Sequence, residues 1–160
     1  MIDGALRESW WRRRIVSPLV AQLKQGATPE KLALTIALGF VLGVFPLLGS
    51  ATFLCGIAAW ALRLNQPVIQ TINYLAYPAQ LAILIPLYRA GSDLFGIPHI
   101  PLSIPFIFER FSAGVWRFLA DFGLIAVRGI VVWLIAAPFA AAAIYCAVVP
   151  LLRRATRRII

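Results

Sequence analysis

The sequence predicts an all-α, polytopic integral membrane protein with broken, re-entrant-like helices and amphipathic helices at the membrane interface. Apolar residues make up 61% of the 160-residue chain and charged residues only 13%, whereas soluble chains contain roughly half and about a quarter. Long stretches carry no charge, over 32–62, 68–88 and 130–149. The chain suits one domain, so we expect residues 1–160 to form a single membrane domain.

The net charge of +9 comes from basic residues that gather at both ends of the chain. The front group is Arg7, Arg12, Arg13, Arg14, Lys24 and Lys31, and the back group is Arg153, Arg154, Arg157 and Arg158. This pattern follows the positive-inside rule, which predicts a multi-pass membrane protein with both termini cytoplasmic. We expect membrane lipids with anionic headgroups as partners, and no nucleic acid, because the charge does not form a continuous face.

The chain contains little of the chemistry that enzymes use. Cys55 and Cys146 lie in apolar runs, and His99 is the only histidine, so no familiar metal-binding spacing occurs. Three carboxylates fall in the mixed region after residue 90, without a spacing that would enforce a catalytic pair: Asp93, Glu109 and Asp121. The sequence therefore predicts a protein without enzymatic activity or cofactor.

Residues 1–26 are predicted to form an interfacial N-terminal helix in two pieces. Ser17-Pro18 combines a capping residue with a first-turn proline, so a new piece starts there. An apolar stripe repeats every four residues beside the arginines, at Trp11, Ile15, Leu19 and Leu23. Gly26 is typical of a helix end.

Residues 27–90 are predicted to form a broken-helix unit. Thr28-Pro29-Glu30 starts a helix, and the following uncharged run is interrupted at Gly43, Pro46, Gly49 and Ser50. Each half of that run is about 20 Å long, less than a hydrocarbon core of about 30 Å. Two interpretations remain open, a re-entrant hairpin and two short tilted crossings. The half-helix ends can hold an anionic group or an ion, or the glycines serve only for close packing.

The second uncharged run contains Pro78 and Pro86 and a polar stripe. Gln70, Asn73, Tyr77 and Gln80 are spaced to share one face of a helix. The stripe either lines a polar path for a headgroup or provides hydrogen bonds between helices. Arg63 and Arg89 bracket the run, as phosphate ligands or as interfacial anchors.

The remainder is predicted to comprise a loop and an interfacial helix over 91–122, then a C-terminal transmembrane helix and basic tail over 123–160. Glycines and prolines between 91 and 105 favour the loop. Residues 106–122 combine aromatic and charged residues, as an amphipathic helix does. Residues 130–149 are long enough to span a bilayer, with Pro138 as a candidate kink.

Several short motifs, in order, resemble the bacterial membrane family catalogued as domain of unknown function 2062. They are Gly26-x-Thr28-Pro29-Glu30-x-Leu32-Ala33, Gly39-x3-Gly43-x2-Pro46-x2-Gly49 and Arg63-Leu64-Asn65-x-Pro67, within about residues 20–96. The family pattern has Asn-Pro where this chain has Tyr77-Pro78. The resemblance implies an inner-membrane protein of a family sometimes attached to glycosyltransferase domains, and it implies no activity.

We hypothesise that the broken-helix unit binds or translocates a lipid-linked or anionic small molecule. The candidate substrate-binding residues are Gly43, Pro46, Gly49, Ser50, Arg63, Asn65, Gln70, Asn73, Tyr77, Gln80 and Arg89. The alternative is a non-catalytic membrane scaffold or partner subunit for an envelope enzyme such as a glycosyltransferase. A membrane protein partner or a homo-oligomer is compatible with either hypothesis.

Overall fold

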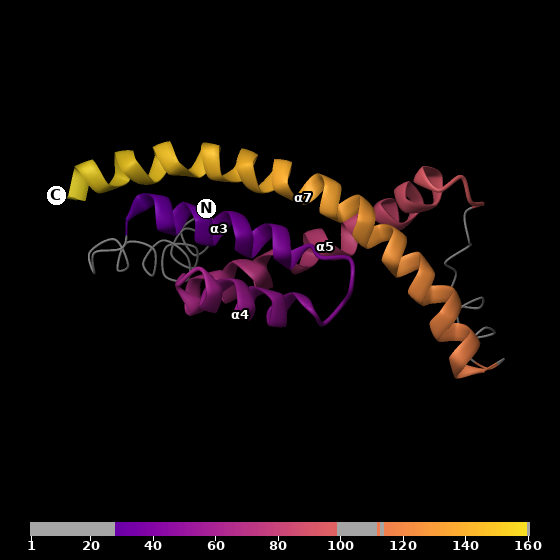
Figure 1. Cartoon of the computed structure of the whole chain (residues 1–160). Helices are drawn as coiled ribbons and strands as arrows, with labels where there is room; N and C mark the ends of the chain where they lie inside the picture. The colour runs from indigo at the N-terminus through magenta and orange to yellow at the C-terminus, as the bar shows by residue number, and fades with distance from the viewer. Residues whose placement is uncertain (1–27, 99–111, 113, 160) are drawn as a thin grey trace, which may run out of the picture.

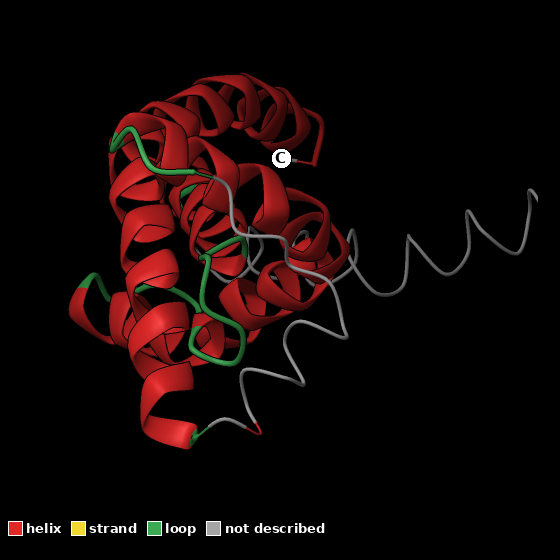
Figure 2. Ribbon diagram, turned by 90° about the vertical axis from the view of Figure 1, so that its right-hand side faces the viewer, coloured by secondary structure: helices red, strands yellow, loops and turns green. Residues whose placement is uncertain are grey.

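The computed structural model describes residues 28–98, 112 and 114–159. This part of the chain consists of helices and connecting loops, without a strand (Figure 2). The all-α prediction is therefore confirmed for the described residues. The interfacial helix predicted over 1–26 lies outside them, as do residues 99–111 and 113 of the loop and interfacial helix predicted over 91–122. The loop predicted from residue 91 begins later, because residues 91–94 belong to a helix.

Helix α3 spans Pro29–Gly43 and begins where the capping signal predicts. Thr28 is the N-cap, and its Oγ1 accepts a hydrogen bond from the backbone N–H of Lys31 at 3.3 Å. Pro29 occupies the first turn, where its missing N–H would have no intrahelical partner in any case. Glu30 adds a negative charge near the positive end of the helix dipole.

Helix α4 spans Ala51–Ala61, and the break between the two helices is confirmed. Residues 44–50, which we call the tip, connect them without helical structure. Helix α3 has 15 residues and helix α4 has 11, which correspond to lengths of about 22 Å and about 16 Å. The chain reverses at the tip, so α3 and α4 form a helical hairpin (Figure 1).

Helix α5 spans Gln66–Leu94 as one helix of 29 residues, about 43 Å long. Asn65 caps its start by accepting a hydrogen bond from the backbone N–H of Val68 at 3.0 Å. Pro78 and Pro86 lie inside the helix and do not end it. The helix continues past the first charged residue, Arg89, and ends six residues beyond the predicted uncharged run.

Helix α7 spans Val115–Ile159 without interruption, which differs from the prediction. Residues 115–122 continue directly into the candidate membrane span, so residue 122 is not the end of a separate interfacial helix. The physical reason is that residues 115–137 contain no proline, and a single glycine such as Gly123 weakens a helix by only about 1 kcal/mol relative to alanine. Pro138 and Pro150 also lie within the continuous helix.

Helix α3 packs against both α5 and α7, and α4 packs mainly on α5 (Figure 1). Close approach depends on glycine: a Cβ on Gly43 would lie 2.8 Å from the Cβ of Ala76 on α5. On α5 and α7, Gly91 faces the backbone of Arg128 and Gly129 faces the ring of Tyr88. Small residues at such contacts are typical of helices packed within membranes.

Two described helices have the length and apolar composition of membrane spans. They are Gln66–Leu94 and the Phe122–Arg157 part of α7. Helix α4 is apolar but too short to span. This agrees with the predicted membrane association of the chain at the level of helix length and composition.

Candidate functional site

Backbone carbonyl groups at and next to the tip accept hydrogen bonds from side chains of the two long helices. Near the end of α3, the carbonyl of Val41 accepts a hydrogen bond from Nε1 of Trp133 on α7 at 3.2 Å. Within the tip, the carbonyl of Phe45 accepts one from Nε2 of Gln80 at 2.7 Å. The end of α3 therefore does not present these groups to a ligand.

The tip is closed further by its own contacts. The hydroxyl of Tyr88 donates a hydrogen bond to the carbonyl of buried Pro46. The ring of Phe45 packs edge-on against that of Trp133, with centroids 4.9 Å apart. Apolar membrane interiors require such internal partners for non-helical backbone, and α5 and α7 supply them.

The remaining tip residues from the candidate list have local roles. Gly49 has a φ of 87°, a conformation that glycine adopts without a Cβ clash. Ser50 is the N-cap residue of α4, but its side chain makes no capping bond and Oγ donates instead to the carbonyl of Leu47 at 2.7 Å. Gly49 and Ser50 therefore shape the turn between α3 and α4.

The polar stripe on α5 faces α4. Nε2 of Gln70 donates to the carbonyl of Thr52 at 3.0 Å, and Nδ2 of Asn73 donates to the hydroxyl of Thr52 at 3.1 Å. Asn73 also donates to Oε1 of Gln70 at 3.3 Å. One turn earlier, Nε2 of Gln66 donates to the carbonyl of Gly56 at 3.0 Å. The structure thus uses the predicted stripe for hydrogen bonds between helices.

Tyr77 departs from the rest of the stripe. Its side chain is 51% exposed, whereas Asn73 and Gln80 are buried. The hydrogen bonds between α4 and α5 end at Asn73 because α4 begins at Ala51, and Tyr77 lies past them. The polar face of α5 that the residue spacing predicts is therefore covered by α4 over only part of its length.

The two candidate arginines are not brought together. Arg63 lies in the turn before α5 and Arg89 near the end of α5, and both are exposed. A helical separation of 26 residues between them corresponds to about 39 Å. Asn65 is committed to capping α5. A single phosphate group cannot contact both arginines.

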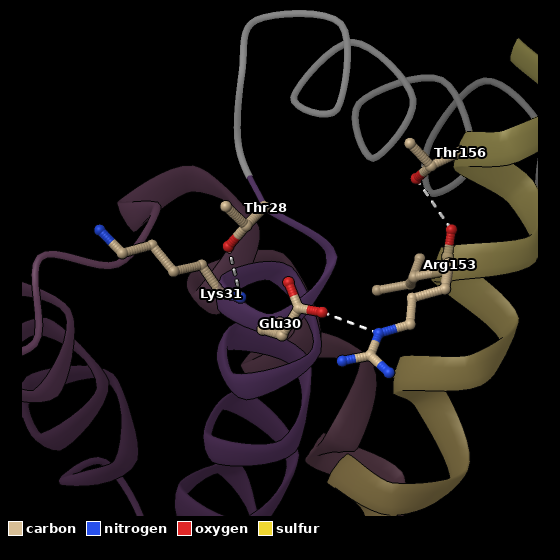
Figure 3. Close-up of polar contacts among 6 residues, drawn as sticks. Thr28, Glu30, Lys31, Arg153 and Thr156 are labelled. Carbon is tan, nitrogen blue, oxygen red and sulfur yellow. Dashed lines mark hydrogen bonds and ion pairs between the residues drawn. The ribbon is translucent and has the colours of Figure 1, made fainter. Parts of the chain in front are cut away.

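An ion pair that the sequence does not reveal joins the start of α3 to the end of α7 (Figure 3). Nε of Arg153 lies 2.8 Å from Oε1 of Glu30, whereas Lys31 extends to the other side. A backbone hydrogen bond at Glu30 and then the bond from Arg153 hold the pKa of its carboxyl below the ordinary value of 4.5. The one sequence signal for this ion pair is that Glu30 is an acidic residue in a chain whose ends are otherwise rich in basic residues.

Among the residues that the structure describes, no group of three or more His, Cys, Asp or Glu side chains can hold a metal ion. Every buried side-chain nitrogen or oxygen within this part has a hydrogen-bond partner. The described residues therefore contain neither a metal cluster nor a buried polar atom waiting for a ligand. The hydrogen bonds of Tyr88 and Trp133 to the tip region were not predicted from the sequence. The available signal was that both residues are hydrogen-bond donors in apolar segments.

A family model described as "Uncharacterized protein conserved in bacteria (DUF2062)" matches residues 12–159. The chain belongs to the DUF2062 family. The match extends well beyond the residues 20–96 that carry the resemblance in sequence. No curated protein and no solved structure matches the chain.

In this DUF2062 protein, the motifs that carry the resemblance have structural roles. Thr28 and Pro29 start α3, and Gly39 and Gly43 allow α5 to approach it. Pro46 lies buried in the tip. In this chain the motifs therefore correspond to a helix start, close helix contacts and a turn, which together build the hairpin.

Proposed function

We propose that this DUF2062 protein is a non-catalytic scaffold or partner subunit of the bacterial inner membrane. The observation that carries the proposal is the internal use of the polar side chains: Gln70, Asn73 and Gln80 all donate to α4 or to the tip. A polar path for a substrate needs unsatisfied groups along it. These side chains instead fix the hairpin against α5.

The proposed arrangement has α5 and α7 as two full crossings and the α3–α4 hairpin as a re-entrant unit. Figure 1 shows the start of α3, the α4–α5 turn and the end of α7 at the same end of the bundle. Between Arg128 and Arg153, α7 is uncharged, and this stretch corresponds to about 36 Å, enough for a hydrocarbon core of about 30 Å. Both basic ends of the chain are then cytoplasmic, in line with the positive-inside rule.

The outer face of α7 is the proposed contact surface for the partner. The most apolar window of α7 has no buried residue. Exposed alanines recur along it, at Ala136, Ala140, Ala143 and Ala147. Small residues let a second membrane helix approach closely, so the outer face of α7 suits a transmembrane helix of another protein. An envelope glycosyltransferase is the partner that the family resemblance suggests.

Photocrosslinking in cells tests this surface. The crosslinking amino acid benzoylphenylalanine is placed at Phe139, which is 74% exposed on α7, and in a matched control at buried Ile125 of the same helix. We expect position 139 to capture one membrane glycosyltransferase whose activity falls when the protein is deleted, and position 125 to capture none. Capture of lipid alone at position 139 would contradict the proposal.

Lipid handling remains a second candidate because of two exposed tyrosines. Tyr74 and Tyr77 are 65% and 51% exposed on α5, and they begin about 12 Å along the helix from its start. A hydroxyl at that depth in hydrocarbon favours a polar partner. If this candidate is right, proteoliposomes translocate labelled polyprenyl phosphate, and replacing both tyrosines by phenylalanine abolishes it. The scaffold proposal predicts no translocation even by the unaltered protein.

A further inference from the structure

Arg63 occupies a backbone position that ordinarily belongs to glycine. Its φ is 51°, and it is the one non-glycine residue with positive φ in the described part of the chain. The hydrogen bonds around it define the end of α4: Leu64 N–H donates to the carbonyl of Ala59 at 2.8 Å, and Arg63 N–H to that of Trp60 at 3.4 Å. This pair of bonds is the Schellman motif, whose left-handed residue is usually glycine because a Cβ is crowded there.

An arginine in this conformation carries a backbone strain that glycine would avoid. Neither a hydrogen bond nor an ion pair of its guanidinium with another described residue explains its presence, and the side chain is exposed. Non-glycine residues in strained conformations cluster at functional sites. The residues at this end of the bundle therefore bear on the role of Arg63.

Exposed basic residues of two other helices lie at the same end of the bundle as the turn that contains Arg63. The exposed residues Lys31, Arg154 and Arg157 come from the start of α3 and the end of α7, which lie at the same end of the bundle as the α4–α5 turn. Glu30 is the carboxylate that the structure describes at this end, and it is paired with Arg153. The positive charge at this end is consequently not neutralised within the described part.

An apolar stripe leads along α4 to Arg63. Phe53, Ile57 and Trp60 are spaced to share the outward face of the helix, and Trp60 is 80% exposed. Tryptophan prefers the headgroup level of a membrane. The order along α4 is therefore apolar side chains, an interfacial aromatic residue and then a cation, which matches the order of acyl chain, glycerol region and phosphate in a phospholipid.

We propose that Arg63 and the basic end of the bundle bind the phosphate-bearing headgroup of an anionic phospholipid, with its acyl chains along the outward face of α4. The phosphate oxygens accept hydrogen bonds from the Arg63 guanidinium. Lys31, Arg154 and Arg157 add long-range attraction for a headgroup with net negative charge. The site lies apart from the alanines that mark the partner surface on α7, and it rests on the proposed re-entrant placement of the α3–α4 hairpin.

Substitution of Arg63 by glycine separates a role in lipid binding from a role in stability. The unfolding midpoint and the lipid preference are expected to change in opposite directions. Arg63→Gly relieves the backbone strain, so we expect the unfolding midpoint in detergent to rise. The same variant loses the guanidinium, so we expect its preference for phosphatidylglycerol over phosphatidylcholine to fall about fivefold, the factor that corresponds to about 1 kcal/mol per basic residue near a membrane. Native mass spectrometry of the full-length protein from mixed micelles counts the retained lipids.

Two matched variants complete the test. Arg63→Ala keeps a Cβ in the left-handed conformation, so its midpoint stays near that of the unaltered protein while its lipid preference falls. Arg63→Lys keeps the charge and retains the preference. The proposal is overturned if Arg63→Gly keeps the full preference, if Arg63→Lys loses as much as Arg63→Ala, or if inorganic phosphate in the buffer displaces phosphatidylglycerol, which would make free phosphate the ligand.

Discussion

Gln80 lies in an uncharged run between Ala79 and Leu81, whose side chains have no hydrogen-bond donor. The amide donates to the carbonyl of Phe45 at the tip, 35 residues away, and the side chain is only 2% exposed. A buried carbonyl that loses its only donor is left with its full desolvation cost. The Gln80 amide therefore stabilises the position of the tip against α5.

We predict that Gln80→Leu destabilises the protein by about 1–3 kcal/mol, because the Phe45 carbonyl is left without its donor. Gln66→Leu is the matched control, since Gln66 makes a similar bond to Gly56 in an exposed position, and we expect it to cost less than about 1 kcal/mol. Denaturant unfolding in mixed micelles measures both. Equal losses for the two variants would contradict a special role of the tip.

The pH dependence of stability provides a second test at the residue scale. The pKa of Glu30 is lowered in the folded protein from 4.5, so its stabilising contribution is present above that value and is lost as pH falls through the folded pKa. We expect Glu30→Gln to lower the melting temperature at pH 7. The difference between the two proteins should shrink as the pH falls below 4.5 and through the folded pKa of Glu30. A difference that stays constant over an acid titration would show that the carboxylate charge is not the cause.

At the scale of helices, the approach of α3 to α5 depends on the absence of a side chain at Gly43. A Cβ there would meet Ala76 Cβ at 2.8 Å and Asn73 Cα at 3.2 Å, and part of this obstacle is backbone. Gly56, in the middle of α4, has no such neighbour within 4 Å. Close packing therefore requires glycine at position 43 but not at position 56, although both residues lie within helices.

Alanine substitutions at these glycines should have effects of opposite sign. We predict that Gly43→Ala destabilises the protein by about 1–3 kcal/mol through overpacking. Gly56→Ala should stabilise it by up to about 1 kcal/mol, because alanine has the higher helix propensity. Unfolding midpoints of both variants in the same detergent provide the comparison. A stabilising Gly43→Ala would mean that α3 and α5 are not in close contact.

Helix starts and the break could be predicted because their signals are local. Thr28-Pro29 starts α3, and the helix ends at Gly43, three residues before Pro46. The partners of the tip could not be predicted, because the choice of Gln80, Tyr88 and Trp133 depends on how distant helices pack. The continuity of α7 was missed because a mixed composition near residue 120 resembles an interfacial helix, while no residue there ends a helix.

At the scale of the whole molecule, the arrangement of charges defines two ends of the bundle. Arg63 and the basic tail lie at one end, and the loop after α5 lies beyond the other end of the helical hairpin (Figure 1). Arg89 and Arg128 mark the level of this second end on the two long helices. With α5 and α7 as full crossings, the two ends lie on opposite sides of the membrane.

This proposed topology predicts which positions react with a membrane-impermeant thiol reagent. Single cysteines are introduced as Phe95→Cys, after α5, and as Arg157→Cys, near the end of α7, in a chain with Cys55 and Cys146 replaced by serine. We expect Phe95→Cys to be labelled from the periplasmic side in intact spheroplasts. Arg157→Cys should be labelled only after lysis. Labelling of both positions before lysis would rule out an odd number of crossings between them.

The helical hairpin has a further consequence for biogenesis. All its charged residues, Glu30, Lys31 and Arg63, lie at its open base, and residues 32–62 between them are uncharged. Moving a charged side chain into hydrocarbon is the main energetic obstacle to insertion of a polypeptide segment. In the proposed re-entrant topology, the segment enters the bilayer from the cytosol already folded as a hairpin, without passing any ionised group through the lipid. That topology predicts that its insertion requires neither the membrane potential nor export of a flanking loop, in contrast to α5 and α7 as full crossings.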